Sequence, residues 1–153
     1  MIVAKLYSCP VHVYAGHFGG PPGDAPMREA ARVELVSGRG ILGDRYFDHP
    51  LGHKGQVTFF AEETWEQLCN EFRRFDLGPG VFRRNILTRG ADLRSLVGKQ
   101  FDVQGVRFEG SEYCKPCFWM DSAFAPGAFA ALAKWRAGGL RARVLSDGHL
   151  LAA

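Results

Sequence analysis

Glu112-Tyr113-Cys114-Lys115-Pro116-Cys117 is the stretch around which this sequence is organised. It holds two of the four cysteines, separated by a lysine and a proline, and it follows a strand-like run. Short apolar runs and glycine turns make up much of the remaining chain, which contains 19 glycines and 12 phenylalanines. This composition favours β structure over a helical bundle. The sequence therefore predicts a mainly β scaffold that positions a pair of cysteines.

The length and charge of the chain limit its class. At 153 residues it suits a single domain, residues 1–153, which can bury a core without disulfides. Its net charge of +3 gives no case for nucleic-acid binding by bulk charge. No stretch reaches about 18 consecutive apolar residues, so we expect no membrane span. Residues 1–8 read as a first strand rather than a signal peptide, so the cysteines indicate reduced thiols and a cytoplasmic location.

The spacing of apolar residues predicts the secondary structure. The clearest helix covers residues 62–74, where Trp65, Leu68 and Cys69 lie on one apolar stripe. A second helix is predicted over residues 126–137, and a short helical turn follows Asp92. Strands are predicted over residues 2–8, 29–36, 56–60, 81–88, 99–103, 106–109, 140–146 and 149–152, with a hairpin turn at 147–148. The predicted fold class is mainly β (α+β), a β-barrel of about eight short strands with two or three covering helices.

Three polar residues interrupt an apolar run near the middle of the chain. Arg83, Arg84 and Asn85 lie inside the predicted strand 81–88, whose side chains alternate between two faces. A plain core does not accommodate two arginines and an asparagine. One face of this strand is therefore expected to meet either solvent or a polar pocket.

A glycine-rich corner precedes this strand. Gly43 and Asp44 follow Gly40 and two apolar residues, and Arg45 comes next. Glycine at such a corner permits positive φ or the close approach of a ligand. Asp44 is expected either to cap local amides or to orient a ligand. The spacing is not that of a Walker motif, which also requires a following Lys-Ser/Thr.

Histidines occur in two loops. His17 lies in a loop rich in glycine and proline, residues 16–26. Long ordered loops are often functional, although a plain surface histidine fits the same pattern. His49 and His53 have the spacing of a helical metal pair, but the proline and glycine between them exclude a regular helix.

The pair Cys114 and Cys117 allows four interpretations. Structural zinc requires four ligands, and without a second pair histidines would have to complete the set. The stretch also resembles a thioredoxin active site, but there the pair opens a helix after the first βα stretch, whereas here it follows many strands. A single thiolate, kept deprotonated by Lys115 and nearby arginines, could ligate a metal or carry sulfur. The fourth interpretation is a buried, unreactive pair.

These motifs, taken in order, resemble a MOSC domain, the family of the C-terminal domain of molybdenum cofactor sulfurases. The resemblance covers residues from about Ile2 to Leu150. It rests on the segments 40–45, 83–86 with Gly90, the hairpin into 114–117, and 138–145 with the terminal Asp-Gly turn. It implies a β-barrel domain that binds the molybdenum cofactor (molybdopterin).

The resemblance also implies roles for individual residues. Cys117 matches the cysteine that ligates molybdenum or accepts sulfur, and Cys114 is the accessory catalytic candidate. The residues expected to bind the cofactor, and its phosphate in particular, are Arg83, Arg84, Asn85, Gly43, Asp44, Arg45, Lys115 and His17.

The implied function is a molybdenum-cofactor-binding protein that ligates molybdenum, or carries sulfur to it, through a cysteine thiolate. One alternative is a small molybdenum-dependent reductase of N-hydroxylated or N-oxide compounds with a separate electron donor. The other is a thiol–disulfide protein that uses Cys114 and Cys117. The expected partners are a cysteine desulfurase, which would hold any pyridoxal phosphate, or an electron-transfer reductase, with no nucleic acid and no membrane. The family's fused desulfurase domain and second barrel do not fit in this length, so we expect weak or transient cofactor binding, or binding by an oligomer.

Overall fold

The computed structural model describes residues 1–13, 25–50 and 52–153, so His17 lies outside the described residues. The strands are β1 (Ile2–Ser8), β2 (Arg28–Ala30), β3 (Arg32–Val36), β4 (Gly40–Ile41), β5 (Val57–Ala61), β6 (Ile86–Arg89), β7 (Gln100–Val103), β8 (Val106–Tyr113), β9 (Leu140–Val144) and β10 (Gly148–Leu151). The α-helices are α1 (Glu62–Phe72), α2 (Trp119–Ala123) and α3 (Ala128–Trp135), and 3₁₀ turns cover Pro79–Phe82 and Leu93–Leu96.

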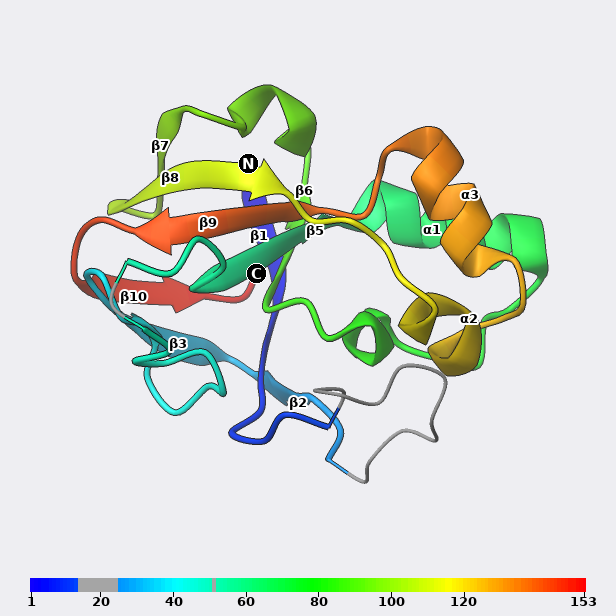
Figure 1. Cartoon of the computed structure of the whole chain (residues 1–153), viewed down its shortest axis with the longest axis horizontal. Coiled ribbons are helices and arrows are strands. Elements are labelled where there is room, and N and C mark those ends of the chain that lie inside the picture. The colour runs from blue at the N-terminus through cyan, green and yellow to red at the C-terminus, as the bar shows by residue number, and fades with distance from the viewer. Residues whose placement is uncertain (14–24, 51) are drawn as a thin grey trace.

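The strands form two sheets (Figure 1). Seven of them make a mixed sheet in the order β2-β1-β6-β5-β9-β8-β7, and β10-β3-β4 make a smaller one. β5 and β6 are parallel, and α1 supplies the crossover connection that a parallel pair requires. The Gln56 side chain ties the two sheets together. It donates to the carbonyl of Gly38 (2.9 Å) and accepts from the amide of Val144 (2.9 Å).

The mainly β, α+β class is confirmed, but the described chain does not form the predicted closed barrel. β2 pairs with β1 and β7 pairs with β8, and these two short strands are the edges of the large sheet. β10 packs against β1 and β8, yet its hydrogen-bonded partner is β3. The small sheet therefore covers the large one by packing, and strand pairing does not close the ring.

Two predicted elements are wrong, and a third, the strand 29–36, is divided at Ala31 between β2 of the large sheet and β3 of the small one. Residues 81–88 are not one strand, because a 3₁₀ turn ends at Phe82, Arg83 has a positive φ of 57°, and β6 begins at Ile86. Residues 147–148 do not join a hairpin, because β9 belongs to the large sheet and β10 to the small one. The Asp147 carboxylate instead accepts the amide of Ser37 (2.7 Å), which holds the chain as it crosses between the sheets.

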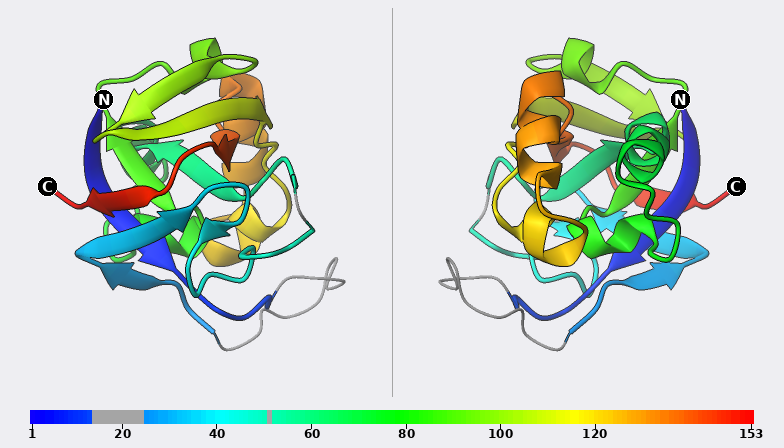
Figure 2. Two further views of the ribbon diagram at one scale, coloured as in Figure 1. Left: turned by 90° about the vertical axis from the view of Figure 1, so that its left-hand side faces the viewer. Right: turned by 90° about the vertical axis from the view of Figure 1, so that its right-hand side faces the viewer.

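The three α-helices gather at one end of the large sheet (Figures 1 and 2). The predicted helix is confirmed as α1, which buries Trp65, Leu68 and Cys69. These side chains join a core cluster beneath the helices, and a second cluster combines residues of both sheets. The segment 114–118 leaves the end of β8 and runs across to α2 at the helical end (Figure 1). None of the helices in the described chain has the length and apolarity to cross a membrane.

Candidate functional site

A cleft of about 390 Å³ opens where the cysteine segment meets the segments before β5 and before β6. Its described lining combines basic, sulfur-containing and aromatic side chains. They are His12, Arg45, Tyr46, Phe82, Arg83, Arg84, Cys114, Lys115, Pro116, Cys117, Trp119, Met120 and Arg141. The structure thus brings six of the predicted site residues to one cleft, namely both cysteines, Lys115 and three arginines.

The cysteine segment is held against the start of β9. The amide of Cys114 donates to the carbonyl of Gly139 (2.9 Å), which extends the β8–β9 pairing by one bond. Gly138 lies so close that a side chain there would overlap the carbonyl oxygen of Cys114 and the ring of Pro116. The carbonyl of Cys117 then accepts the amide of Met120 (3.0 Å) and leads into α2. Cys117 is therefore placed by a rigid sheet on one side and a helix on the other.

The two cysteines differ in exposure. Cys114 is 3% exposed, whereas Cys117 is half-buried and open to the cleft. Cys9 and Cys69 are buried, as expected for small hydrophobic residues, and burial raises the pKa of the Cys69 thiol. Among the four thiols, Cys117 is the one with access to a bound ligand.

An ion-pair chain lies behind Cys114. Lys54 Nζ donates to Glu112 Oε2 (2.8 Å), and Arg141 Nη1 donates to Glu112 Oε1 (2.6 Å). The hydrogen bond from Lys54 is the main reason that the pKa of Glu112 is lowered. Burial acts to lower the pKa of Arg141, but the charge and hydrogen bonding of Cys114 and Glu112 outweigh it, so this pKa is raised. Arg141 thus presents a fixed positive charge to the sulfur of Cys114.

The polar residues 83–85 serve different ends. The guanidinium of Arg83 is buried and donates to the carbonyls of Ala25 (2.7 Å) and Val11 (2.8 Å), so it fixes the chain on either side of residues 14–24. Arg84 is half-buried, lines the cleft, and donates from Nε to the carbonyl of Gly138 (3.1 Å). Of the two terminal nitrogens of Arg84, Nη1 donates to the carbonyl of Phe82 (3.2 Å), whereas both terminal nitrogens of Arg83 donate to carbonyls. Among the described residues, Arg84 therefore has more hydrogen-bonding capacity left for a ligand than Arg83.

Asn85 is fully buried and bonds within the protein. Its Oδ1 accepts the amide and the hydroxyl of Thr58 (3.1 and 2.9 Å). Its Nδ2 donates to the carbonyl of Tyr7 (3.3 Å) and to Asp44 Oδ2 (3.1 Å). Asn85 therefore links β1, β5 and the glycine corner beneath the cleft.

Asp44 is the centre of the same buried network. Its carboxylate accepts from the amides of Cys9 (3.1 Å) and Tyr46 (3.2 Å) and from Arg45 Nη1 (3.2 Å). Burial lowers the pKa of Arg45, whose Nη2 also donates to the carbonyl of Arg83 (2.9 Å). Arg45 reaches the cleft, whereas Asp44 acts beneath it. Gly43 has a φ of 80° with open space beside it, so glycine is required there by the turn.

A group of rings adjoins the cleft, and the sequence did not single out the two members that line it, His12 and Tyr46. Tyr46 contacts the rings of His12 (4.9 Å between centroids), His49 (5.5 Å) and His53 (5.8 Å). His49 and His53 also contact each other, at 4.9 Å. Burial lowers the pKa of His53, and His49 and Arg141 add to this shift. The described residues hold no group of three His, Cys, Asp or Glu side chains arranged to bind a metal.

The described side chains that line the cleft and carry a charge are all positive. Four arginines and one lysine line it, and no aspartate or glutamate does so among the described residues. Such a surface attracts anions, and guanidinium groups are the preferred partners of phosphate. With the thiol of Cys117 in its wall, the cleft can hold an anionic ligand next to a sulfur nucleophile or metal ligand.

Fold and site together define an α+β domain that carries a cysteine in a cationic cleft. A family model described as the MOSC domain matches residues 47–152, so the chain belongs to the MOSC domain family, which is associated with the molybdenum cofactor. No curated protein sequence matches the chain at a significant level.

Solved structures share the fold. The YUAD protein from Bacillus subtilis superposes with a TM-score of 0.72 at 15% identity, covering 98% of this chain and 90% of that protein. YiiM from Geobacillus stearothermophilus gives 0.71 at 13% identity, covering 98% and 70%. YiiM from Escherichia coli gives 0.62 at 19% identity, covering 94% and 65%. At these identities the likeness establishes the fold alone.

Proposed function

We propose that the cleft binds the molybdenum cofactor and that Cys117 offers its thiolate to molybdenum. The observation that carries this proposal is a half-buried cysteine in a cleft lined by five basic side chains and, within the described chain, by no acidic one. A thiolate is a soft ligand, and arginine is suited to the phosphate of the cofactor. Membership of the MOSC family supports the same assignment.

The residues present fit this cofactor in size and chemistry. A volume of about 390 Å³ lies within the range of roughly 300–1,000 Å³ that is usual for small-molecule sites. Trp119, backed by the buried Phe82 and Met120, gives the cleft an apolar surface against which a flat ring system can lie. The indole of Trp119 is held by a hydrogen bond from Nε1 to the carbonyl of Val81 (2.7 Å), so this surface is fixed before a ligand arrives.

Each side chain has a separate task in this proposal. Cys117 ligates the metal, and Arg84 and Lys115 bind the anionic end of the cofactor. Arg141 holds Cys114 at the back of the cleft, while Asp44 keeps Arg45 in place beneath the rim. When bound, the cofactor supplies a metal that exchanges electrons together with an oxygen or sulfur atom.

The proposal has two forms. In the first, the protein handles the cofactor and Cys117 ligates molybdenum or carries sulfur to it, which a separate pyridoxal-phosphate-dependent desulfurase provides. In the second, Cys117 is a permanent ligand in a small reductase of N-hydroxylated or N-oxide compounds, with a separate electron donor. Reductive loss of oxygen consumes protons, and the imidazole of His12 at the cleft favours the second form.

Thiol–disulfide exchange fits the site less well. In that chemistry the first cysteine of the pair attacks and must be exposed. Here Cys114 is 3% exposed, and the more accessible sulfur belongs to the second cysteine, Cys117.

Metal analysis tests the proposal. The protein is expressed together with an active molybdopterin pathway, purified, and analysed for molybdenum beside Cys117→Ser and Cys69→Ala. We expect Cys117→Ser to lose most of the metal and Cys69→Ala, altered in the helical core, to keep it. Equal molybdenum in all three proteins, whether high or near zero, counts against Cys117 as a ligand.

A further inference from the structure

His12 is the only imidazole that lines the cleft within the described chain. It is exposed to solvent and shares the cleft wall with Arg84 and Cys117. Imidazole is the side chain that ordinarily exchanges a proton near neutral pH, and no carboxylate lines the described cleft to compete with it. The two thiols of the cleft are otherwise engaged, Cys114 with Arg141 and Cys117 as the proposed metal ligand.

The orientation of the His12 ring is fixed by one hydrogen bond. His12 Nε2 lies 3.0 Å from the carbonyl oxygen of Arg45. A carbonyl oxygen accepts and cannot donate, so Nε2 carries the proton in the neutral ring. Nδ1 is then the nitrogen that gains and loses a proton. A base held by a third group in this way is the usual arrangement of a general acid–base residue.

Two rings and mainly positive charged groups lie around His12. The Tyr46 ring meets it edge-on at 4.9 Å and the His49 ring lies at 5.8 Å. The Arg45 guanidinium lies 5.0 Å from the centre of the Tyr46 ring, and Arg83 donates to the carbonyl of Val11 beside His12. Arg84, Lys115 and Arg141 line the same cleft.

We propose that His12 is the general acid of the cleft and donates a proton from Nδ1 to the oxygen that leaves the substrate. This inference rests on the reductase form of the proposed function. The substrate is an N-hydroxylated compound, and the step takes two electrons from a reduced electron-transfer protein and two protons. The N–O bond breaks, the oxygen takes one proton and leaves as water, and the nitrogen keeps an electron pair and takes the second proton. One proton comes from His12 and the other from solvent, which also reprotonates the exposed ring.

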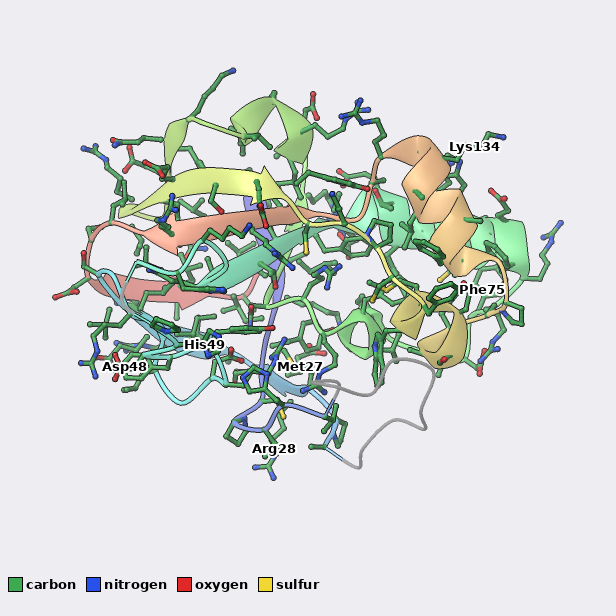
Figure 3. All side chains as sticks on the ribbon, viewed as in Figure 1. Met27, Arg28, Asp48, His49, Phe75 and Lys134 are labelled. Carbon is green, nitrogen blue, oxygen red and sulfur yellow. The ribbon has the colours of Figure 1, made fainter. Side chains whose placement is uncertain are left out.

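The test compares His12→Gln with His49→Gln in molybdenum-loaded protein. Glutamine keeps a donor for the Arg45 carbonyl but has no protonatable nitrogen. His49 belongs to the same ring group and does not line the cleft; Figure 3 shows it on the side of the small sheet, away from Phe75 and Lys134 at the helical end. Turnover of an N-hydroxylated amidine is followed with reduced viologen as the donor.

We expect His12→Gln to lose about 10²–10⁴-fold in kcat at unchanged molybdenum content, the usual contribution of general acid catalysis. In the wild type, kcat should fall at alkaline pH as His12 gives up its proton. This fall should be absent in His12→Gln, which has no such acid to lose. His49→Gln should keep both the rate, within about threefold, and the pH profile. In the metal-free protein, nitrogen NMR should find the neutral His12 ring protonated at Nε2.

Several results would overturn the role of His12. They are an unaltered kcat and alkaline limb in His12→Gln, an equal loss in His49→Gln, and a neutral His12 ring protonated at Nδ1. A wild-type protein that carries molybdenum but reduces no N-hydroxylated or N-oxide compound overturns the reductase form itself. A wild-type protein that carries no molybdenum overturns the cofactor assignment.

Discussion

Replacing Asp44 by alanine should destabilise the protein strongly, because this carboxylate serves the fold beneath the cleft. It is 5% exposed and accepts hydrogen bonds from Cys9, Tyr46, Asn85 and Arg45. Alanine would remove this acceptor from three neutral donors and from one buried guanidinium, which would also lose its carboxylate partner. Removing one partner of a buried ion pair costs about 3–5 kcal/mol, so we expect a loss of this size in the free energy of unfolding.

Urea denaturation followed by tryptophan fluorescence measures this loss. Asp102→Ala is the matched control, since Asp102 also pairs with an arginine, Arg107, but both side chains are more than half exposed. Surface ion pairs contribute little, so the control should keep the midpoint of the wild type. A loss below about 1 kcal/mol in Asp44→Ala, no more than one ordinary hydrogen bond, would refute the structural role and leave Asp44 free to bind a ligand.

Three further predictions concern the cleft. Arg84→Ala should weaken cofactor binding by about 1.5–3 kcal/mol at an unchanged urea midpoint, whereas Arg83→Ala should lower that midpoint; equal cofactor content in both variants would contradict this. Gly138→Ala should lower both the thermal midpoint and the molybdenum content, because its methyl group would overlap the carbonyl of Cys114; wild-type values would contradict this. The pKa of Glu112 is lowered, so its stabilising effect is complete above the ordinary glutamate pKa of about 4.3 and is lost as pH falls through the lowered value. Glu112→Gln should flatten the acid limb of the urea midpoint against pH, and an unaltered limb would contradict the ion-pair chain.

Local sequence patterns correctly predicted the secondary-structure elements that are determined by neighbouring residues. The helix α1 follows from one apolar stripe, and the pairing of β7 with β8 follows from alternating residues around a Gln-Gly turn. The barrel could not be predicted in the same way. Closure depends on whether β10 pairs with the large sheet or with β3, and the sequence of β10 is compatible with both.

The polar residues 83–85 show the same limit within the site. Their presence in an apolar run indicated a special role, which local patterns can detect. Their partners lie far away in the sequence, however, since Arg83 binds the carbonyls of Val11 and Ala25, and Asn85 binds Tyr7 and Asp44. A local pattern cannot distinguish a residue that binds a ligand from one that hydrogen-bonds to backbone groups far away in the sequence.

The sequence around His12 contained no pattern that indicated a functional role. This histidine stands in a short apolar run, and its position at the cleft depends on a carbonyl of Arg45, 33 residues further along. Arg141 was not predicted for a related reason. Arginines alternate with core residues along β9, and only Arg141, which lies beside Glu112 and Cys114, lines the cleft.

The most direct test of the central claim is X-ray absorption at the molybdenum edge of the loaded protein. We expect a molybdenum shell that includes a sulfur from Cys117, so any metal retained by Cys117→Ser should have one sulfur neighbour fewer than the wild type. Cys114→Ser should have the wild-type shell, because Cys114 is buried beside Arg141. An identical sulfur count in the wild type and Cys117→Ser would show that Cys117 is not a ligand, as would the loss of a sulfur in Cys114→Ser instead.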